Sequence, residues 1–304
     1  MLRRRVLVFD AGRNIGDNLR CFGVFKAFAK AHPELEVVCW LSPEINEKIG
    51  PLLRSSKALS GFVVSSRSPK ETYRINHQML KYIKVSGKDW LWSSFPGGKG
   101  PDHNEYASII PTGEPWFSAK LLFGQGLEEP ETINQGLFLA DLLGLDQEAV
   151  SEAQPLLGRR EQTERYVTVG LCRPDPQDPK QLPPQRREEA WKTLLDTGLD
   201  LVAVDYQDHS PPPKSDQVAD MRMNTLEEKI PTLNKAAFHV GSDGGLVHFA
   251  AACGCPTLGF YAGPGPSPGT VFGPWPPQGV RGEHVYTHSF AVFLEEIQKI
   301  PHLI

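Results

Sequence analysis

The sequence lacks a long hydrophobic run. No stretch approaches the ~20 consecutive apolar residues of a membrane-spanning helix. Near the start, the apolar run Val6–Phe9 is shorter than the ~7–15 residues of a signal-peptide core, and Asp10 interrupts it. The basic residues Arg3–Arg5 are too few to anchor a protein to a membrane by themselves. We therefore expect a cytoplasmic protein with at most weak peripheral membrane contact.

Paired cysteines and an excess of positive charge are also missing. The five cysteines are an odd number without a C-x-x-C pair, and each lies in an apolar context, which argues against a disulfide framework. Cys253 and Cys255 are separated by one glycine, and we expect them to be reduced core residues rather than zinc ligands. The net charge of −4 gives no reason to expect a nucleic-acid partner.

Low-complexity segments and short repeats are absent, and strands alternate with helices instead. The first half predicts strands at Val6–Phe9, Glu36–Leu41 and Gly61–Ser65, with a helix at Leu19–Ala31 after the first of them. A further strand is expected near Trp90–Ser94, followed by a segment that is too rich in glycine and proline for us to expect a regular element in it. This alternation is typical of a parallel α/β sheet.

The same alternation begins again after a polar stretch at 151–165, which we interpret as a linker. The expected strands are Tyr166–Leu171, Leu199–Val204, Ala237–Val240 and Thr257–Tyr261, and the expected helices are Gln185–Asp196, Leu226–Leu233, Leu246–Cys253 and Ser289–Ile300. A further helix is expected before the linker, at Thr132–Leu143. Because single cores rarely exceed ~250–300 residues, we predict two Rossmann-like domains, 1–155 and 156–304. The last helix is free to pack back on the first domain.

The first candidate site is the loop AGRNIGDN, between the first strand and the first helix. Ligands of parallel α/β sheets bind at the carboxyl ends of the strands, and helix N-termini there favour anions. Gly12 and Gly16 permit close backbone approach, but they do not form the G-x-G-x-x-G pattern of dinucleotide oxidoreductases. Asp17 fits two roles, a helix cap or a general base directed into a cleft.

The second candidate site is the segment SDGGLVH, residues 242–248. Gly244 and Gly245 leave the first turn of a helix without bulky side chains, so its backbone N–H groups are accessible to a diphosphate. Asp243 fits either a contact to a sugar hydroxyl or a helix cap. His248 lies one turn into the helix, where it either reaches the same cleft or packs beneath it.

Two further loops carry polar groups that fit a ligand. Arg173 and Lys180 belong to the proline-rich loop CRPDPQDPKQLPP, where a basic side chain either meets a phosphate or is solvated. The segment FPGGKGPDHNEYASIIPTGEPW contains Lys99, His103 and Trp116, which we interpret as candidate acceptor-binding residues. Trp116 offers an aromatic face for a sugar, and an ordinary surface loop is the alternative.

Taken together and in this order, these loops resemble the glycosyltransferase family 9 heptosyltransferases, which have the GT-B fold. The first similar stretch is IGDNLRCFGVFKAFAKAHPELEVVCWLSPE, and the stronger one is TLEEKIPTLNKAAFHVGSDGGLVHFAAACGCPTLGFYAGPGPSP. The family motif D-[TS]-G-x-x-H matches Asp243 to His248, except that Gly244 replaces the hydroxyl residue. The resemblance covers about two thirds of the chain and excludes residues 66–135.

The resemblance implies a GT-B architecture in which two Rossmann-like parallel-sheet domains face each other across a cleft. It assigns Asp17 as the catalytic base, and the neighbouring Asn14 and Gly16 then fall on the acceptor side. Asp205 is an alternative to Asp208 as the acidic residue for the ribose. The donor-binding residues expected from the motif and the basic loop are Arg173, Lys180, Asp208, Asp243, Gly244, Gly245, Leu246 and His248.

The implied activity is inverting, metal-independent transfer of a sugar from a nucleotide-diphosphate donor, with ADP-heptose as the expected donor, to an acceptor hydroxyl. No D-x-D pair in a metal-binding context occurs, and no cofactor is expected. Two alternatives remain open at this point. One is a non-catalytic sugar-nucleotide-binding protein, which Gly244 favours, and the other is a sugar-nucleotide epimerase of similar fold.

Overall fold

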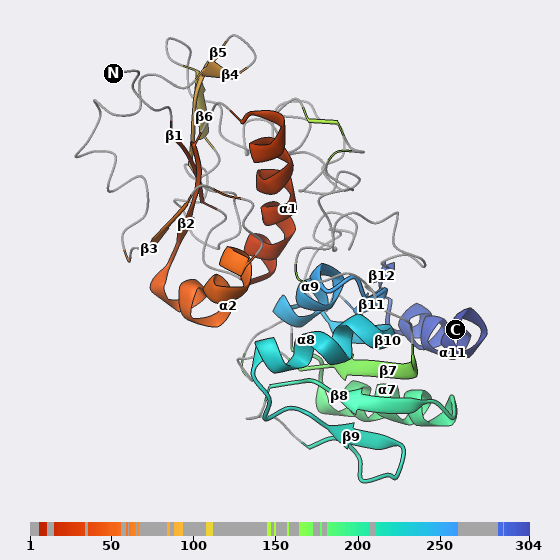
Figure 1. Ribbon diagram of the computed structural model, residues 1–304. Coiled ribbons are helices and arrows are strands. Elements are labelled where there is room, and N and C mark those ends of the chain that lie inside the picture. Colours follow the sequence, from red (N-terminus) through yellow and green to blue (C-terminus); the bar gives the residue numbers. More distant parts are fainter. Residues whose placement is uncertain are drawn as a thin grey trace. The chain divides into compact units, whose positions relative to one another are not determined.

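A computed structural model shows that the chain divides into two compact units (Figure 1). The first comprises Met1–Pro130 and Gly136–Ala153, and the second Glu131–Gln135 and Gln154–Ile304. No helix among the described residues is long and apolar enough to cross a membrane. The structure describes residues 6–10, 15–33, 36–55, 59, 61–64, 66, 84–85, 88–93, 108–111, 145–146, 149, 157, 164–172, 177, 181–206, 211–260, 285–287 and 289–304.

A small parallel sheet forms the centre of the first unit. Its strands lie in the order β1 (Val6–Asp10), β2 (Glu36–Leu41) and β3 (Gly61–Val64), which confirms the three predicted strands. Helix α1 (Ile15–Ala31) connects the first two strands, and α2 (Pro43–Ser55) connects the second to the third. The sequence analysis did not predict α2.

Helix α1 begins earlier than predicted, at Ile15 rather than Leu19, so Gly16 and Asp17 belong to its first turn and not to the preceding loop. An acidic residue in that position complements the positive end of the helix dipole, which favours an early start. One side of the helix is fully buried. Its large buried side chains recur at helical spacing and are Leu19, Phe22, Phe25 and Phe28.

A three-stranded antiparallel ribbon is the second element of this unit. It consists of β4 (Lys84–Val85), β5 (Lys88–Ser93) and β6 (Ser108–Pro111), in that order. The expectation that the glycine- and proline-rich segment has no regular element is therefore wrong at β6. Ile109 and Ile110 pair with Trp92 and Leu91 of β5, so β-branched residues prevail locally.

The second unit contains a fully parallel six-stranded sheet, which confirms the predicted α/β class. The strands lie in the order β12-β11-β10-β7-β8-β9. The order of the strands reverses between β7 and β10, which are neighbours in the sheet. The strand bounds are β7 Glu164–Gly170, β8 Asp200–Ala203, β9 Val218–Asp220, β10 Ala236–Ser242, β11 Thr257–Phe260 and β12 Val285–Thr287.

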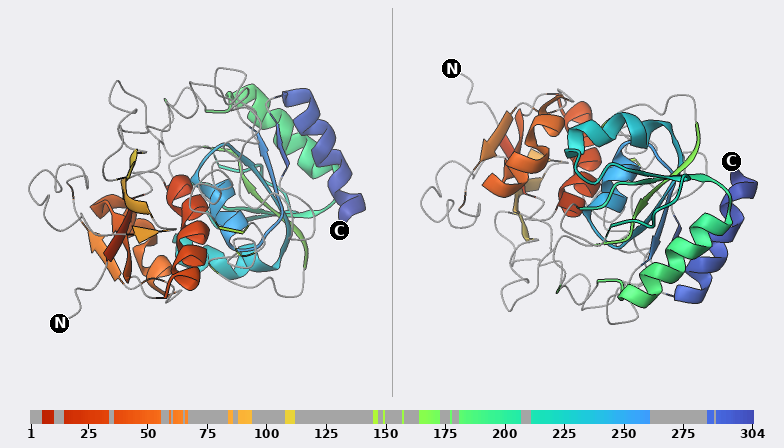
Figure 2. Two further views of the ribbon diagram at one scale, coloured as in Figure 1. Left: turned by 90° about the horizontal axis from the view of Figure 1, so that it is seen from above. Right: turned by 90° about the horizontal axis from the view of Figure 1, so that it is seen from below.

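Helices cover both faces of this sheet (Figure 2). Helices α7 (Pro184–Asp196) and α11 (Phe290–Leu303) lie together on one face, where α11 packs against α7 and β11. Helices α8 (Leu226–Lys235) and α9 (Gly245–Ala252) cover the other face, against β7, β10 and β11. The core between the sheet and α7 and α11 includes Val169, Trp191, Leu201, Phe260 and Phe293.

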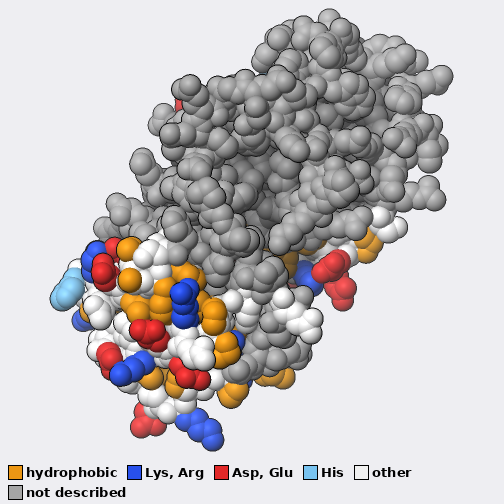
Figure 3. Space-filling view, turned by 180° about the vertical axis from the view of Figure 1, so that it is seen from behind, with side chains coloured by type: hydrophobic (Ala, Val, Ile, Leu, Met, Phe, Trp, Pro, Cys, Tyr) orange, Lys and Arg blue, Asp and Glu red, His pale blue; other side chains and the backbone are white. Residues whose placement is uncertain are grey.

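The described part of the face drawn in Figure 3 carries side chains of both charge signs. On the face drawn in Figure 3, acidic and basic side chains alternate over the described part of the molecule and do not gather into a patch of one sign.

The described cysteines lie inside, as the sequence predicted for core residues. They are Cys39, Cys172, Cys253 and Cys255.

Replacing Gly241 with alanine is expected to destabilise the second unit by about 1–3 kcal/mol. A Cβ atom there would lie 2.8 Å from Val247 Cγ2, 2.9 Å from His239 Nε2 and 3.0 Å from the Gly170 carbonyl oxygen. Chemical denaturation measures the loss. Gly170→Ala is the matched control and should cost less, because its nearest neighbours are side-chain atoms at 3.3 Å. Equal losses in both variants would contradict this account of the packing.

Candidate functional site

The carboxyl ends of β7, β8 and β10 meet at one edge of the parallel sheet. Leu171 and Cys172 follow β7, Asp205 follows β8, and Asp243 follows β10. In open α/β sheets, ligands bind outside the carboxyl ends of the strands where the strand order reverses. Here that point lies between β7 and β10. The described part of the chain therefore offers its candidate site at this edge.

The turn between β10 and α9 is built from the predicted Asp-Gly-Gly. The Asp243 N–H donates to the Phe260 carbonyl at 2.7 Å, which ties the turn to β11, and only 6% of Asp243 is exposed. Gly244 is the N-cap of α9, so no side chain of the N-cap occupies the first-turn N–H groups. A helix start of this kind attracts anions through its N–H groups and its dipole.

The structure brings the other predicted residues of this motif into the same helix. Leu246 is buried, and its Cδ1 faces Gly170 of β7 closely enough that a Cβ there would lie 3.3 Å away. His248 is only 7% exposed, so most of its imidazole is packed within the second unit. Asp243 and Gly244 thus precede α9 at the switch point, and Gly245, Leu246 and His248 lie in the first part of the helix.

A buried histidine that the sequence analysis missed lies beneath this turn. His239 of β10 places Nδ1 3.0 Å from Thr168 Oγ1. Burial lowers the pKa of His239 to about 3, so its imidazole is neutral at physiological pH. Its ring fits because Gly170 and Gly241 carry no side chains. The two glycines also let the first turn of α9 approach the sheet closely. Gly170 and Gly241 pair with each other in adjacent strands, a long-range contact that the sequence did not predict.

Asp205 is anchored to the end of the neighbouring strand. Its Oδ2 accepts the Leu171 N–H and its Oδ1 the Cys172 N–H, both at 2.9 Å, and only 4% of the residue is exposed. Burial raises the pKa of this carboxyl to about 6, and the two backbone bonds act in the opposite direction. The sequence offered Asp205 as an alternative ribose ligand. In the structure each of its two oxygens accepts one backbone N–H, and the ribose role stays a prediction.

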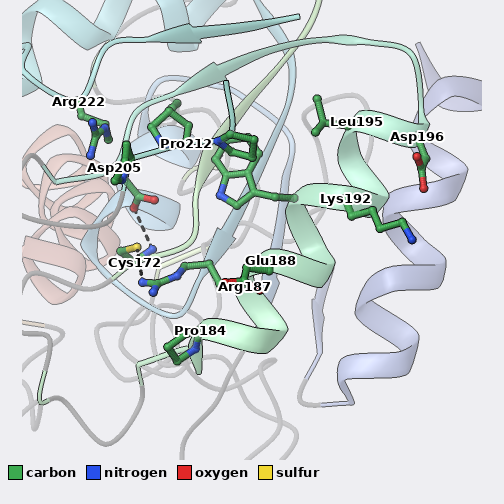
Figure 4. A pocket seen from close by; sticks show the side chains of 14 residues that line it. Cys172, Pro184, Arg187, Glu188, Lys192, Leu195, Asp196, Asp205, Pro212 and Arg222 are labelled. Atoms are coloured by element: carbon green, nitrogen blue, oxygen red, sulfur yellow. Dashed lines mark hydrogen bonds between the residues drawn. The ribbon is translucent and has the colours of Figure 1, made fainter. Parts of the chain in front are cut away.

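A cavity of about 570 Å³ opens beside this anchor, between α7 and the segment after β8 (Figure 4). Arg187 Nη1 donates to Cys172 Sγ at 3.1 Å. Burial, with a smaller effect of Asp205, raises the pKa of the Cys172 thiol to about 11, so it is not a nucleophile at neutral pH. Residues of α7, of β8 and of the segments after β7, β8 and β9 line the cavity, among them Cys172, Arg187, Trp191, Asp205, Pro212 and Arg222.

Arg222 reaches the cavity from the end of β9. Its guanidinium is held by Asp220, with Nε 2.9 Å from Oδ1 and Nη2 2.9 Å from Oδ2. These bonds lower the pKa of Asp220 and raise that of Arg222, so both remain charged. The sequence analysis missed Arg222 because β9 has only three residues and no buried run that would predict a strand.

The remaining predicted residues fall into two groups. Gly16 and Asp17 lie in the first turn of α1, in the first unit. The others lie outside the described residues, and their assignment stays a prediction. These are Asn14, Lys99, His103, Trp116, Arg173, Lys180 and Asp208.

No protein-family profile and no curated protein sequence matches this chain. Several solved structures are similar to it. The E. coli heptosyltransferase WaaC with ADP matches with a TM-score of 0.55 and 13% identity over 97% of this chain and 99% of that one. The glycosyl transferase family 9 structure from Veillonella parvula matches with a TM-score of 0.50 and 11% identity over 100% of this chain and 95% of that one.

A weaker match is the iron-containing dodecameric glycosyltransferase TibC from enterotoxigenic E. coli, with 16% identity and a TM-score of 0.47. It covers 84% of this chain, which spans only 58% of the TibC chain. At such identities a match shows a shared fold. The matches to WaaC and to the Veillonella parvula structure show that the chain has the fold of the family 9 glycosyltransferases, and the predicted resemblance is confirmed at that level.

Proposed function

We propose that this protein is a glycosyltransferase of the family 9 type, which transfers a sugar from a nucleotide-diphosphate donor to an acceptor hydroxyl. The observation that carries the proposal is the Asp243–Gly245 turn, which presents an N-terminal helix end at the strand-order switch point. The fold supports it, because it is shared with WaaC, which was solved with ADP and with ADP-2-deoxy-2-fluoro heptose.

The donor diphosphate binds at the start of α9 in this proposal. Backbone N–H groups at 244–246 and the helix dipole stabilise the negative charge that develops as the diphosphate leaves. Arg173 and Lys180 add positive charge from the loop after β7. Adenosine is the proposed nucleoside, with ADP-heptose as the donor, because WaaC binds ADP.

The acceptor belongs to the first unit in this proposal, where Asp17 acts as the base. Its carboxylate takes the proton of the acceptor hydroxyl, and the oxygen attacks the anomeric carbon of the donor sugar. The bond from that carbon to the diphosphate breaks, and the nucleoside diphosphate leaves with the electron pair. The attack inverts the anomeric carbon and uses no metal ion.

Calorimetric titration with nucleotides in the presence of EDTA tests the donor assignment. We expect ADP to bind with a micromolar to millimolar dissociation constant, as is common for substrates, and to bind more tightly than UDP. Retention of affinity in EDTA is the result expected of a metal-independent site. A protein that binds UDP better than ADP, or neither of them, would refute the assignment.

Replacing Gly244 with serine is expected to tighten ADP binding by about tenfold, which corresponds to one charge-assisted hydrogen bond. Gly244 has φ 175° and ψ 179°, an extended conformation that serine adopts without strain. Its hydroxyl would restore the phosphate ligand that the family motif carries. Gly244→Ala is the control, because it adds the Cβ atom without the hydroxyl. Equal ADP affinities of the two variants would remove this interpretation of the position.

A second candidate function is a non-catalytic sugar-nucleotide-binding protein. Gly244 favours it, because a site without that hydroxyl has one phosphate ligand fewer. This candidate predicts nucleotide binding without transfer of the sugar. Product analysis therefore separates it from the enzyme, whereas a binding measurement alone does not.

A further inference from the structure

We propose that Asp205 and Lys229 are positioning residues that hold the carboxyl ends of β7, β8 and β9 together as one rigid edge for the donor nucleotide. The inference rests on the proposed function in that it names what the edge supports. Two buried charged groups carry it, one of each sign. Neither belongs to the predicted donor motif at the start of α9.

Asp205 connects the ends of β7 and β8. Its two carboxylate oxygens accept the N–H groups of Leu171 and Cys172, both at 2.9 Å. The adjacent Val204 N–H donates to the Val169 carbonyl at 2.9 Å, so the sheet ladder continues directly into this anchor. Hydrogen bonds to a charged acceptor are stronger than those between neutral groups. The backbone that begins the loop after β7 is therefore fixed by a side chain from the next strand.

Lys229 connects the ends of β8 and β9. It lies in the first part of α8 and is only 4% exposed, and its Nζ lies 3.4 Å from the carbonyl oxygens of both Asp205 and Arg222. A buried ammonium group is costly unless acceptors surround it. An apolar side chain would fill the same space without that cost. The two carbonyl contacts therefore indicate that this lysine joins the two strand ends.

The start of α8 keeps Lys229 in place. The Thr225 N–H donates to Glu228 Oε2 at 2.7 Å, and the Glu228 N–H donates to Thr225 Oγ1 at 3.3 Å, which is a complete capping box. The ammonium group thus projects from a helix turn whose position is fixed. Cys172, Asp205 and Arg222, which the two residues hold, all line the cavity of Figure 4. The strand ends that Asp205 and Lys229 hold together therefore also form part of the cavity wall.

The Asp205 anchor is expected to respond to pH. Burial raises the pKa of its carboxyl from 3.8 to about 6, so the anionic form that binds both amides most strongly is lost as pH falls through about 6. The groups that face it are Cys172 and Arg187 from the β7–α7 side and Lys229 and Arg222 from the β9–α8 side. Burial lowers the pKa of Lys229, and the nearby carboxylates, Asp205 first among them, oppose that shift.

The first experiment compares Asp205→Asn with Asp200→Asn, an exposed position at the start of β8, in calorimetric titrations with ADP. At pH 7.5 Asp205→Asn should bind about tenfold more weakly, the loss of one charge-assisted hydrogen bond. At pH 5 the two affinities should converge, because the Asp200→Asn protein then carries a protonated Asp205. The comparison cancels the titration of ADP itself. A ratio that stays constant with pH would overturn the positioning role.

The second experiment measures amide hydrogen exchange in Lys229→Met, with Lys235→Met of the same helix as the control. Lys235 is half exposed and pairs with Glu164 at 3.4 Å. We expect exchange at residues 221–224 to accelerate by about tenfold or more in Lys229→Met only, and exchange at Leu171 and Cys172 to accelerate in Asp205→Asn. Unchanged exchange in both variants would refute the network.

Failure of the wild-type protein to bind ADP would refute the proposed function alone. If one of the two variants does not fold, hydrogen exchange in the other variant still tests the network.

Discussion

Replacing Asp17 with asparagine is expected to lower the rate of sugar transfer by about 100- to 10,000-fold, the usual contribution of a general base. Asparagine has nearly the same shape but cannot accept the acceptor proton. The affinity for ADP should remain unchanged, because the nucleotide belongs to the second unit in this account. Initial rates of nucleoside diphosphate release in the presence of acceptor measure the first effect, and calorimetry measures the second.

The competing interpretation of Asp17 is purely structural. The residue lies in the first turn of α1, where a carboxylate stabilises the helix by about 0.5 kcal/mol through the dipole. Glu47→Gln, at an exposed position of α2, is the control for a lost carboxylate in the same unit. Turnover of Asp17→Asn equal to that of Glu47→Gln would leave Asp17 with the structural role only.

Replacing Lys180 with alanine is expected to weaken ADP binding by about 10- to 100-fold, which corresponds to the loss of a charge-assisted contact to phosphate. In the sequence, Lys180 precedes the buried Leu182 and the start of α7 at Pro184. The wild-type affinity should also fall more steeply with salt than that of the variant, because ionic contacts are screened.

Lys214→Ala is the control for this prediction, because Lys214 is an exposed lysine in the segment between β8 and β9. Its ADP affinity should equal that of the wild-type protein. If Lys180→Ala also binds ADP as the wild type does, Lys180 has no role at the phosphates. Arg173 would then be the remaining basic candidate in the same loop.

The fold class was predictable because buried parallel strands appear as short apolar runs. All eight expected strands, such as Glu36–Leu41 and Thr257–Tyr261, correspond to observed ones within a few residues. The strands β9 and β12 were missed because each has only three residues and no apolar run that would reveal it. The strand order was also not readable, because it depends on contacts between segments far apart in the sequence. The switch point therefore emerged only from the structure.

The candidate site was predictable where it is local in the sequence. The segment from Asp243 to His248 was recognisable because two glycines occur at the start of a predicted helix. In the structure Gly244 caps that helix and Gly245 begins it. The role of Asp205 depends on amides 33 and 34 positions earlier in the chain. Lys229 belongs to an amphipathic helix, where a lysine would ordinarily be solvated. Long-range contacts of this kind leave no local pattern.

The most direct test of the central claim is to incubate the wild-type protein with a panel of nucleotide sugars and a carbohydrate extract of the cells that produce it. Mass spectrometry then identifies both the nucleoside diphosphate released and the acceptor that gains mass. The account predicts that ADP is released from ADP-heptose in step with the appearance of a heptosylated product, with EDTA present. Nucleotide binding without release of a diphosphate from any sugar in the panel would contradict it.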